Sequence, residues 1–262
     1  MQNAYSVAGH WAGDYDEQAL QDWAESLRAK LESPQVSLGL TFLSPKFFPQ
    51  AAQILELLRV HARIPLLAGC SSPGLIVGDQ EVEEKAGLSL GLYALPGADL
   101  RGFHFTQAQV EEMTDPINWT SRTGVSPEQT NGWLVFADPF HMDCEGWLKG
   151  WNEAYPSRPV LGGLASGISE NLLTQVYLNG EVHEEGGVAQ VGQLWHKTLL
   201  LCESVRSRQT QYRRAGRKPQ GSGAIRSPIW RERGLGAYST ATSPRDRAQC
   251  TASPRVFRPI LA

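Results

Sequence analysis

The spacing of apolar residues changes several times along the chain, and each change marks a predicted element. From residue 16 to residue 31, apolar side chains recur every three or four positions, which predicts an amphipathic helix after Asp14 or Asp16. Residues 35–44 alternate bulky apolar residues with small ones, as strands do. A helix over residues 49–60 then leads to an apolar strand over residues 64–68. These two strands are therefore expected to run parallel.

The same order of elements recurs after residue 131. Residues 133–137 form a continuous apolar run typical of a central strand, and residues 143–154 predict a helix with Trp147 and Trp151 one turn apart in its core. Other assignments are a lead-in over residues 1–14, a polar connector over 106–131 with a Thr106-capped helix at 107–113, and strands at 81–85, 87–95, 100–105, 172–178, 181–185, 187–192 and 198–201.

One loop of small residues occurs twice. Residues 65–74 read Pro-Leu-Leu-Ala-Gly-Cys-Ser-Ser-Pro-Gly, and residues 159–167, 94 positions later, read Pro-Val-Leu-Gly-Gly-Leu-Ala-Ser-Gly. This alignment pairs Gly69 with Gly163 and Ser72 with Ser166. We therefore predict an α/β fold of two tandem related strand–helix–strand–loop–strand–strand units, about residues 35–105 and 132–203, forming a mixed sheet with covering helices.

Charge divides the chain into two parts. Residues 1–203 carry 11 Lys and Arg against 25 Asp and Glu, a net charge of −14, whereas residues 204–262 carry 13 against 2, a net charge of +11. Residues 204–262 have no apolar periodicity and many Arg, Ser and Pro residues, which predicts a disordered basic tail. Such a tail attracts nucleic acid or anionic membrane only through its charge, so we expect no specific nucleic-acid partner and no membrane partner.

The four cysteines are widely spaced and include no CxxC pair, so a disulfide framework is not indicated. The sequence contains neither a secretory leader nor an apolar run long enough to span a bilayer. We therefore expect a soluble, cytoplasmic protein.

Several residues at the strand ends have two readings. Glycines and serines there either present backbone N–H groups and hydroxyls to a ligand or permit close packing and complete turns. Cys70 is either a nucleophile or a small residue that lines the site. Asp138 either binds an amine of the ligand or forms a turn, and Phe140 either forms a wall of the pocket or packs in the core. The candidate ligand-binding residues are Gly69, Cys70, Ser71, Ser72, Asp138, Phe140, Gly162, Gly163 and Ser166.

A metal or haem site has weaker support. His141 and Cys144 are three positions apart, and His183, His196 or Cys202 are further possible ligands, but a second close pair is lacking. Haem needs only one or two axial ligands, which His104, His141, His183 or His196 could supply. We therefore expect no cofactor, with haem as the alternative.

The two loops and the Asp138-Pro139-Phe140 segment between them, in this order and spacing, resemble the FIST domain, named for F-box and intracellular signal transduction proteins. The resemblance covers about residues 15–203 and implies the N-terminal part of a sensory domain that binds small ligands such as amino acids, with haem carried by some members. The family's C-terminal part would begin where the basic tail starts. We hypothesise that the tail is an out-of-frame or substituted ending, which sequencing of the locus would test.

These readings combine into a functional hypothesis. The chain is expected to be a non-catalytic sensory domain that binds a small polar metabolite at the paired loops and acts on a downstream signalling protein. Three alternatives remain open: a haem-based gas sensor, an adaptor without a ligand, and an enzyme that depends on a cysteine.

Overall fold

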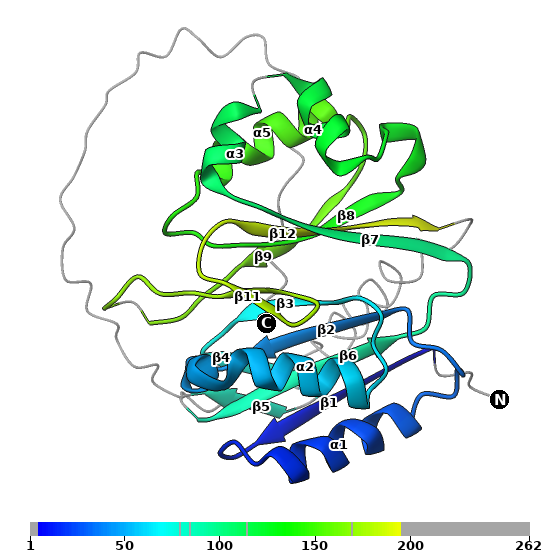
Figure 1. The fold of residues 1–262 in the computed structure, drawn as a ribbon, viewed down its shortest axis with the longest axis vertical. Helices are drawn as coiled ribbons and strands as arrows, with labels where there is room; N and C mark the ends of the chain where they lie inside the picture. Colours follow the sequence, from blue (N-terminus) through cyan, green and yellow to red (C-terminus); the bar gives the residue numbers. More distant parts are fainter. Residues whose placement is uncertain (1–4, 79, 84, 114, 169, 195–262) are drawn as a thin grey trace, which may run out of the picture. The chain divides into compact units, whose positions relative to one another are not determined.

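The computed structural model describes residues 5–194, apart from residues 79, 84, 114 and 169 (Figure 1). Strands alternate with helices over residues 6–71 and again over residues 132–164, and each of these stretches leads into a run of consecutive strands. The strands are β1 (Ser6–Ala12), β2 (Leu38–Leu43), β3 (Leu67–Ser71), β4 (Gly74–Val77), β5 (Gln80–Glu83), β6 (Gly87–Tyr93), β7 (Ala98–Phe105), β8 (Gly132–Ala137), β9 (Val160–Leu164), β10 (Val176–Leu178), β11 (Glu181–His183) and β12 (Gly187–Leu194). The helices are α1 (Glu17–Ala29), α2 (Ala51–His61), α3 (Gln107–Glu112), α4 (Pro116–Thr123) and α5 (Cys144–Ala154), with 3₁₀ turns at Pro45–Gln50 and Pro127–Gln129.

The strands form two larger sheets and one separate hairpin. The six-stranded sheet has the order β1-β6-β2-β3-β10-β11, the four-stranded sheet has the order β7-β12-β8-β9, and β4 pairs with β5. Both larger sheets are mixed, because β2–β3 and β8–β9 are parallel pairs and their other pairs are antiparallel. The predicted mixed α/β fold is thus confirmed, with its strands divided between two sheets rather than gathered in one.

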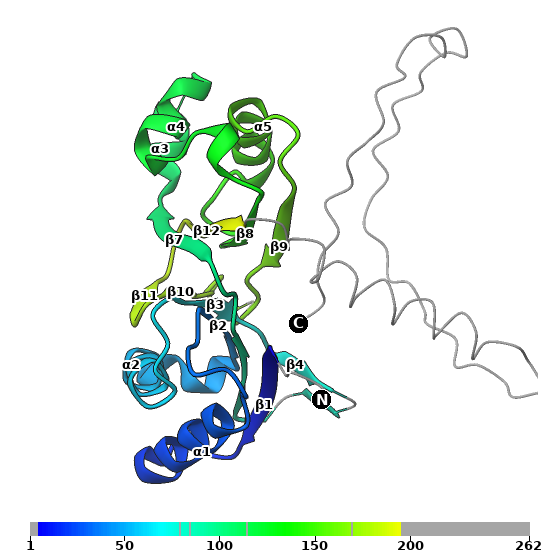
Figure 2. The ribbon, with the colours of Figure 1, turned by 90° about the vertical axis from the view of Figure 1, so that its right-hand side faces the viewer.

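Helices cover one face of each larger sheet (Figure 2). On the six-stranded sheet, α1 and α2 bury leucine and isoleucine side chains such as Leu20 and Ile54 against β2, β3 and β6. Asp16 caps α1 by accepting a hydrogen bond from the backbone N of Ala19 (2.9 Å). On the four-stranded sheet, α4 and α5 build an aromatic core in which Trp147 and Trp151 are buried, as predicted.

The other faces of the two sheets contribute side chains to a third buried cluster. Phe42 of β2 and Phe136 of β8 meet edge to face, with ring centroids 5.5 Å apart. The buried members of the cluster are Leu38, Leu66, Ala68, Cys70, Phe136, Ala165, Val176, Leu178 and Val188. The ends of strands from both sheets are consequently held next to each other.

The two larger sheets share one order of strands, but this order divides the chain differently from the predicted repeat units. The strand β7 was expected to close the first unit, yet it pairs with β12 along its whole length and so belongs to the second sheet. Conversely, β10 and β11 come from the second unit but extend the first sheet beside β3. The order β1-β6-β2-β3 therefore matches β7-β12-β8-β9, with each unit beginning one strand earlier than predicted.

Two further assignments are wrong for local reasons. The lead-in expected over residues 1–14 contains β1, an edge strand that mixes small residues with partly buried Val7 and Trp11 and so lacks a plain alternation. The connector expected over residues 106–131 contains α4, which Asp115 caps and Pro116 begins, in addition to the predicted helix after Thr106. The strand expected at 198–201 and the basic tail lie outside the described residues.

No described helix has the length and apolar character needed to cross a membrane.

Candidate functional site

The carboxyl ends of β3, β8 and β9 meet at one place. The backbone N of Ser166, after β9, donates a hydrogen bond to the carbonyl O of Ser71 at the end of β3 (3.0 Å). The two repeated loops predicted from the sequence are therefore in direct contact. We call this place the strand-end junction and define it by Ser71, Asp138, Phe140, His141, Ser166, Thr174 and Gln175.

Asp138 is the polar centre of the strand-end junction. Its buried carboxylate accepts four hydrogen bonds: at Oδ1 from Phe140 N (2.9 Å) and Thr174 Oγ1 (2.8 Å), and at Oδ2 from His141 N (3.0 Å) and His141 Nδ1 (2.8 Å). These bonds make the turn after β8 and tie it to the segment before β10. Within the described structure the carboxylate is thus engaged by the chain itself, which matches the turn reading of Asp138.

His141 is the accessible member of this arrangement. Its side chain is 48% exposed, whereas that of Asp138 is 1% exposed. Because Nδ1 faces Asp138, the carboxylate fixes the orientation of the ring, and Nε2 is the nitrogen left for a ligand. The sequence analysis considered His141 only as a ligand for metal or haem. The Asp-Pro-Phe-His order at a strand end is the signal that points to its present role.

Ser71 and Ser72 hold the strand-end junction together from inside. Both are buried, and the hydroxyl of Ser71 accepts a hydrogen bond from the backbone N of Gln175 (3.0 Å). The hydroxyl of Ser72 donates to the carbonyl O of Gly74 (2.6 Å). Both hydroxyls therefore have backbone partners, whereas Ser166 is exposed.

Cys70 lies in the buried cluster between the sheets, where desolvation raises the pKa of its thiol to about 12. Cys144, next to the junction, donates through Sγ to the carbonyl O of Asp138 (3.6 Å). Burial, followed by the charges of Asp138 and Asp143, raises the pKa of that thiol to about 11. Both groups are therefore thiols rather than reactive thiolates near neutral pH.

The close approach of the neighbouring strand requires glycine at positions 69 and 162. A Cβ added to Gly69 would lie 1.7 Å from the carbonyl O of Thr41, and one added to Gly162 would lie 1.7 Å from that of Val135. These two glycines are the structural equivalents, so the sequence pairing of Gly69 with Gly163 is wrong by one position. The shift arises because β9 begins one residue earlier relative to its partner strand. Short apolar and glycine runs do not fix that register.

The other predicted residues lie around the same strands. Phe140 is exposed beside His141, and Gly163 lies opposite Phe136 in β9. Phe140 is therefore available as a wall for a ligand rather than as a core plug. The exposed groups at the strand-end junction are the ring of Phe140, the imidazole of His141 and Ser166.

The remaining histidine candidates lie elsewhere. His104 of β7 and His183 of β11 stack with ring centroids 3.7 Å apart and planes within 7°. Burial lowers the pKa of His183, and the neighbouring His104 lowers it further. Across residues 5–194, as far as they are described, no group of three or more His, Cys, Asp and Glu side chains is arranged to hold a metal ion. His196 and Cys202 lie outside the described residues.

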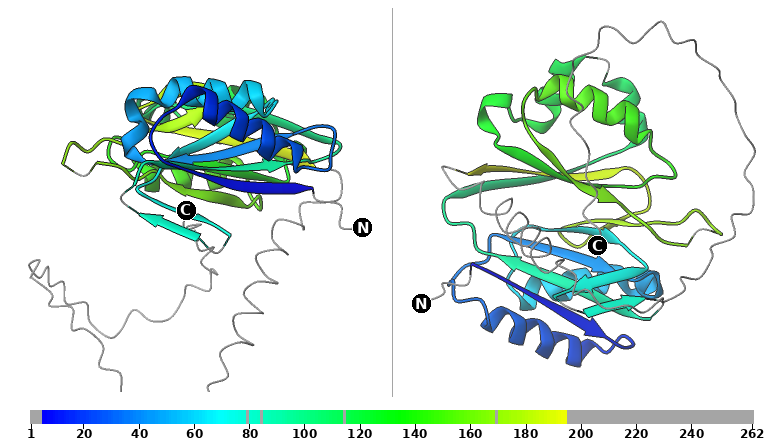
Figure 3. Two further views of the ribbon diagram at one scale, coloured as in Figure 1. Left: turned by 90° about the horizontal axis from the view of Figure 1, so that it is seen from below. Right: turned by 180° about the vertical axis from the view of Figure 1, so that it is seen from behind.

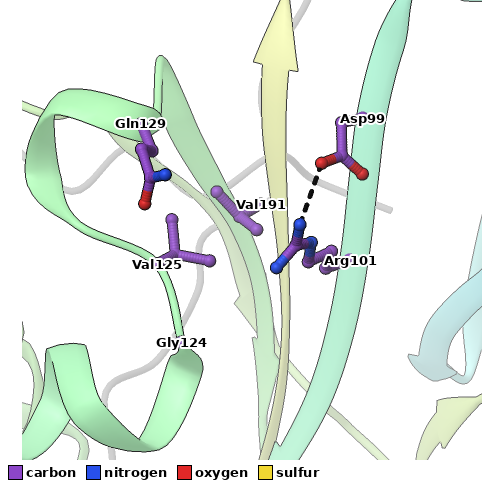
Figure 4. A pocket seen from close by; sticks show the side chains of 6 residues that line it. All are labelled: Asp99, Arg101, Gly124, Val125, Gln129 and Val191. Carbon is purple, nitrogen blue, oxygen red and sulfur yellow. Dashed lines mark hydrogen bonds and ion pairs between the residues drawn. The ribbon is translucent and has the colours of Figure 1, made fainter.

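A shallow hollow lies at a distance in sequence from all the predicted loops (Figure 4). Its volume is about 280 Å³, including space open to solvent, and Asp99 and Arg101 of β7 line it together with Val125, Gln129 and Val191. Asp99 and Arg101 form an exposed ion pair (3.1 Å). Since none of the predicted site residues lines this hollow, we regard it as a surface feature and place the candidate site at the strand-end junction.

Sequence reasoning also missed a buried polar side chain. Gln190 of β12 is 4% exposed, and neither its amide N nor its amide O has a hydrogen-bond partner among the described residues. It lies beside Gly102, close to the leucines of the buried cluster between the sheets. A glutamine within an otherwise apolar alternation was the available signal.

Comparison with known proteins gives one family. A family model described as the FIST N domain matches residues 37–199, which is more than half of the chain. No curated protein sequence matches the chain. The match spans every residue of the strand-end junction.

Proposed function

We propose that this chain, which belongs to the FIST N domain family of signal-transduction sensory domains, binds a small polar metabolite at the strand-end junction and performs no catalysis. The observation that carries the proposal is the hydrogen bond from Ser166 N to Ser71 O, which brings the two repeated loops together. Strand ends of α/β sheets are frequent ligand positions, because backbone and side-chain groups of several strands converge there.

The exposed groups at the strand-end junction favour a ligand that carries a carboxylate, such as an amino acid. The Ser166 hydroxyl is able to donate a hydrogen bond to an anionic oxygen, and the Phe140 ring offers an apolar wall. Because Nδ1–H of His141 donates to Asp138, the neutral ring presents Nε2 as an acceptor, which suits the ammonium group of an amino acid. The buried Asp138 holds the imidazole in place, which reduces the entropy lost on binding.

The same geometry suggests how binding reaches a partner. Ser71 belongs to the six-stranded sheet, and Asp138 follows a strand of the four-stranded sheet. The adjacent residues Thr174 and Gln175 link the two, because Thr174 donates a hydrogen bond to Asp138 and Gln175 donates one to Ser71. A ligand held at the strand-end junction would therefore bias how the two sheets pack. A downstream signalling protein would read that change.

The cysteine-dependent enzyme is the less favourable alternative. A nucleophilic cysteine needs a lowered pKa, whereas the pKa values of Cys70 and Cys144 are raised to about 12 and about 11.

A thermal-shift screen of the full chain tests the proposal. The probes are the amino acids, nucleotides and haem, with an absorption spectrum of the purified protein alongside. A ligand at 100 times its Kd should stabilise the fold by about 2.7 kcal/mol. We expect an amino acid or similar carboxylate to raise the melting temperature, and His141→Ala and Ser166→Ala to abolish the shift.

Ile117→Ala is the matched control, because Ile117 is an exposed residue of α4 outside the junction. A shift that survives both junction variants would place the ligand elsewhere and overturn the proposed site. A haem absorption band would favour the gas sensor, and a folded protein that no probe stabilises would favour the adaptor.

A further inference from the structure

The repeat supplies a template for a sheet edge that no described strand covers. In the six-stranded sheet, β10 covers the outer edge of β3 in antiparallel orientation, with Tyr177 opposite Gly69 and Leu178 opposite Ala68. The equivalent of β3 is β9, whose described pairing is with β8 alone (Figure 2). The other edge of β9 therefore presents backbone groups that its counterpart uses for strand pairing.

The edge of β9 has the character of a strand-binding surface. Leu161 and Leu164 are 40% and 48% exposed, and no charged residue occurs in β9. By contrast, the edge strand β7 carries Asp99 and Arg101. Charged side chains are a usual protection of sheet edges against pairing, and β9 lacks it.

The repeat also identifies the strand that matches β10. The β4–β5 and β10–β11 hairpins both have two-residue turns. Val77 pairs with Gln80 at the end of the first hairpin, as Leu178 pairs with Glu181 at the end of the second, so Val77 corresponds to Leu178. The strand β4 is therefore the counterpart of β10. It pairs with β5 and with no other described strand, and Ile76 on it is 51% exposed.

Within one chain, β4 is held away from β9. Only Ser72 and Pro73 separate β3 from β4, whereas eleven residues, 165–175, separate β9 from β10. Ser72 is fixed by its backbone N, which donates to Leu43 O (2.9 Å), and by its hydroxyl on Gly74 O. Leu75 is buried beside Gly87 of β6, and the hairpin projects from the six-stranded sheet (Figure 3, left).

We propose that β9 is a docking edge for the β4 strand of a second copy of this chain. The strands pair antiparallel in the register that β10 uses on β3, with Val77 opposite Leu161 and Ile76 opposite Gly162. The large side chain of Ile76 then crosses a glycine, as Tyr177 crosses Gly69. The exchange is reciprocal, so that two copies form a closed two-fold dimer in which Ile76 and Leu161 are covered.

The test measures the mass of the full chain by sedimentation equilibrium over a wide range of concentration. Wild type is expected to dimerise, and Leu161→Lys and Val77→Glu are each expected to raise the dimer Kd by about tenfold or more, because each places a charge against an apolar neighbour. The double variant Leu161→Lys/Val77→Glu restores the dimer, since opposite charges then face each other across the two strands. Ile117→Lys, on α4, leaves the dimer unchanged.

Three results would overturn the inference. If the wild-type chain stays monomeric at every concentration, β9 does not bind β4 of a second copy. A dimer that survives both single variants uses another surface. A dimer lost in Leu161→Lys but kept in Val77→Glu shows that β9 binds a strand other than β4. Each variant should have the circular dichroism spectrum and melting temperature of wild type, which shows that the dimer is not lost because the variant has unfolded.

Discussion

Replacing Asp138 tests whether the polar network of the strand-end junction supports the fold. The Asp138→Ala substitution removes the acceptor for four hydrogen bonds at once, from Phe140 N, His141 N, His141 Nδ1 and Thr174 Oγ1. Bonds to a charged acceptor contribute about 1.5–3 kcal/mol each when their donors cannot reach water. Thr174 is fully buried, whereas Phe140 and His141 are exposed enough for their donors to find water.

We therefore expect Asp138→Ala to lower the free energy of unfolding by about 3–4 kcal/mol, with the Thr174 bond contributing the largest share. Urea denaturation followed by circular dichroism measures the change, and an unchanged m-value shows that the same surface unfolds. Asp143→Ala is the matched control, because Asp143 caps α5 through one exposed bond to Gly146 N (2.9 Å) and should cost about 1 kcal/mol.

A Thr174→Val variant completes a double-mutant cycle with Asp138→Ala. The two residues are in direct contact, so a coupling energy of about 1–2 kcal/mol is expected between them. An Asp138→Ala variant no less stable than Asp143→Ala would refute the reasoning, as would a coupling energy near zero.

Three further experiments probe other features. Gly162→Ala places a Cβ 1.7 Å from a carbonyl O at a positive φ and should cost about 3 kcal/mol or more, whereas Gly124→Ala, with open space around it, should cost about 1 kcal/mol in the same denaturation assay. The lowered pKa of His183 means that the unfolded chain binds its proton more readily, so the melting temperature should fall as pH drops below about 6.5, and His183→Phe should weaken that dependence. With the other cysteines replaced by serine, Cys70 should react with a thiol reagent far more slowly in the native protein than in urea; equal rates would contradict its burial.

The sequence predicts the local elements well where one face of an element is buried. The helix over residues 143–154 and the caps at Asp16 and Thr106 are all present, because they depend on residues close together in the chain. The division into sheets was not predictable. A strand such as β7 has the same alternation in either sheet, and its partner β12 lies more than 80 residues away.

The candidate site was predictable in position but not in detail. The repeated loops located Ser71 and Ser166, and Asp138 was identified between them. Which of their polar groups stay exposed depends on the partners that tertiary packing supplies, such as Gln175 for Ser71 and Thr174 for Asp138. The orientation of His141 likewise follows from a contact that the composition of the loop alone does not specify.

The exchange of strands between the two halves of the chain has a consequence for synthesis on the ribosome. Ala68 of β3 pairs with Leu178 of β10, 110 residues later. At about 5–20 residues per second, β3 waits roughly 5–20 s after translation before its covering strand exists. During that interval its edge is open to other nascent chains. Chaperone dependence in crowded, high-level expression would be the expected cost of this topology, and a lower expression level, with fewer nascent chains present at once, its simplest remedy.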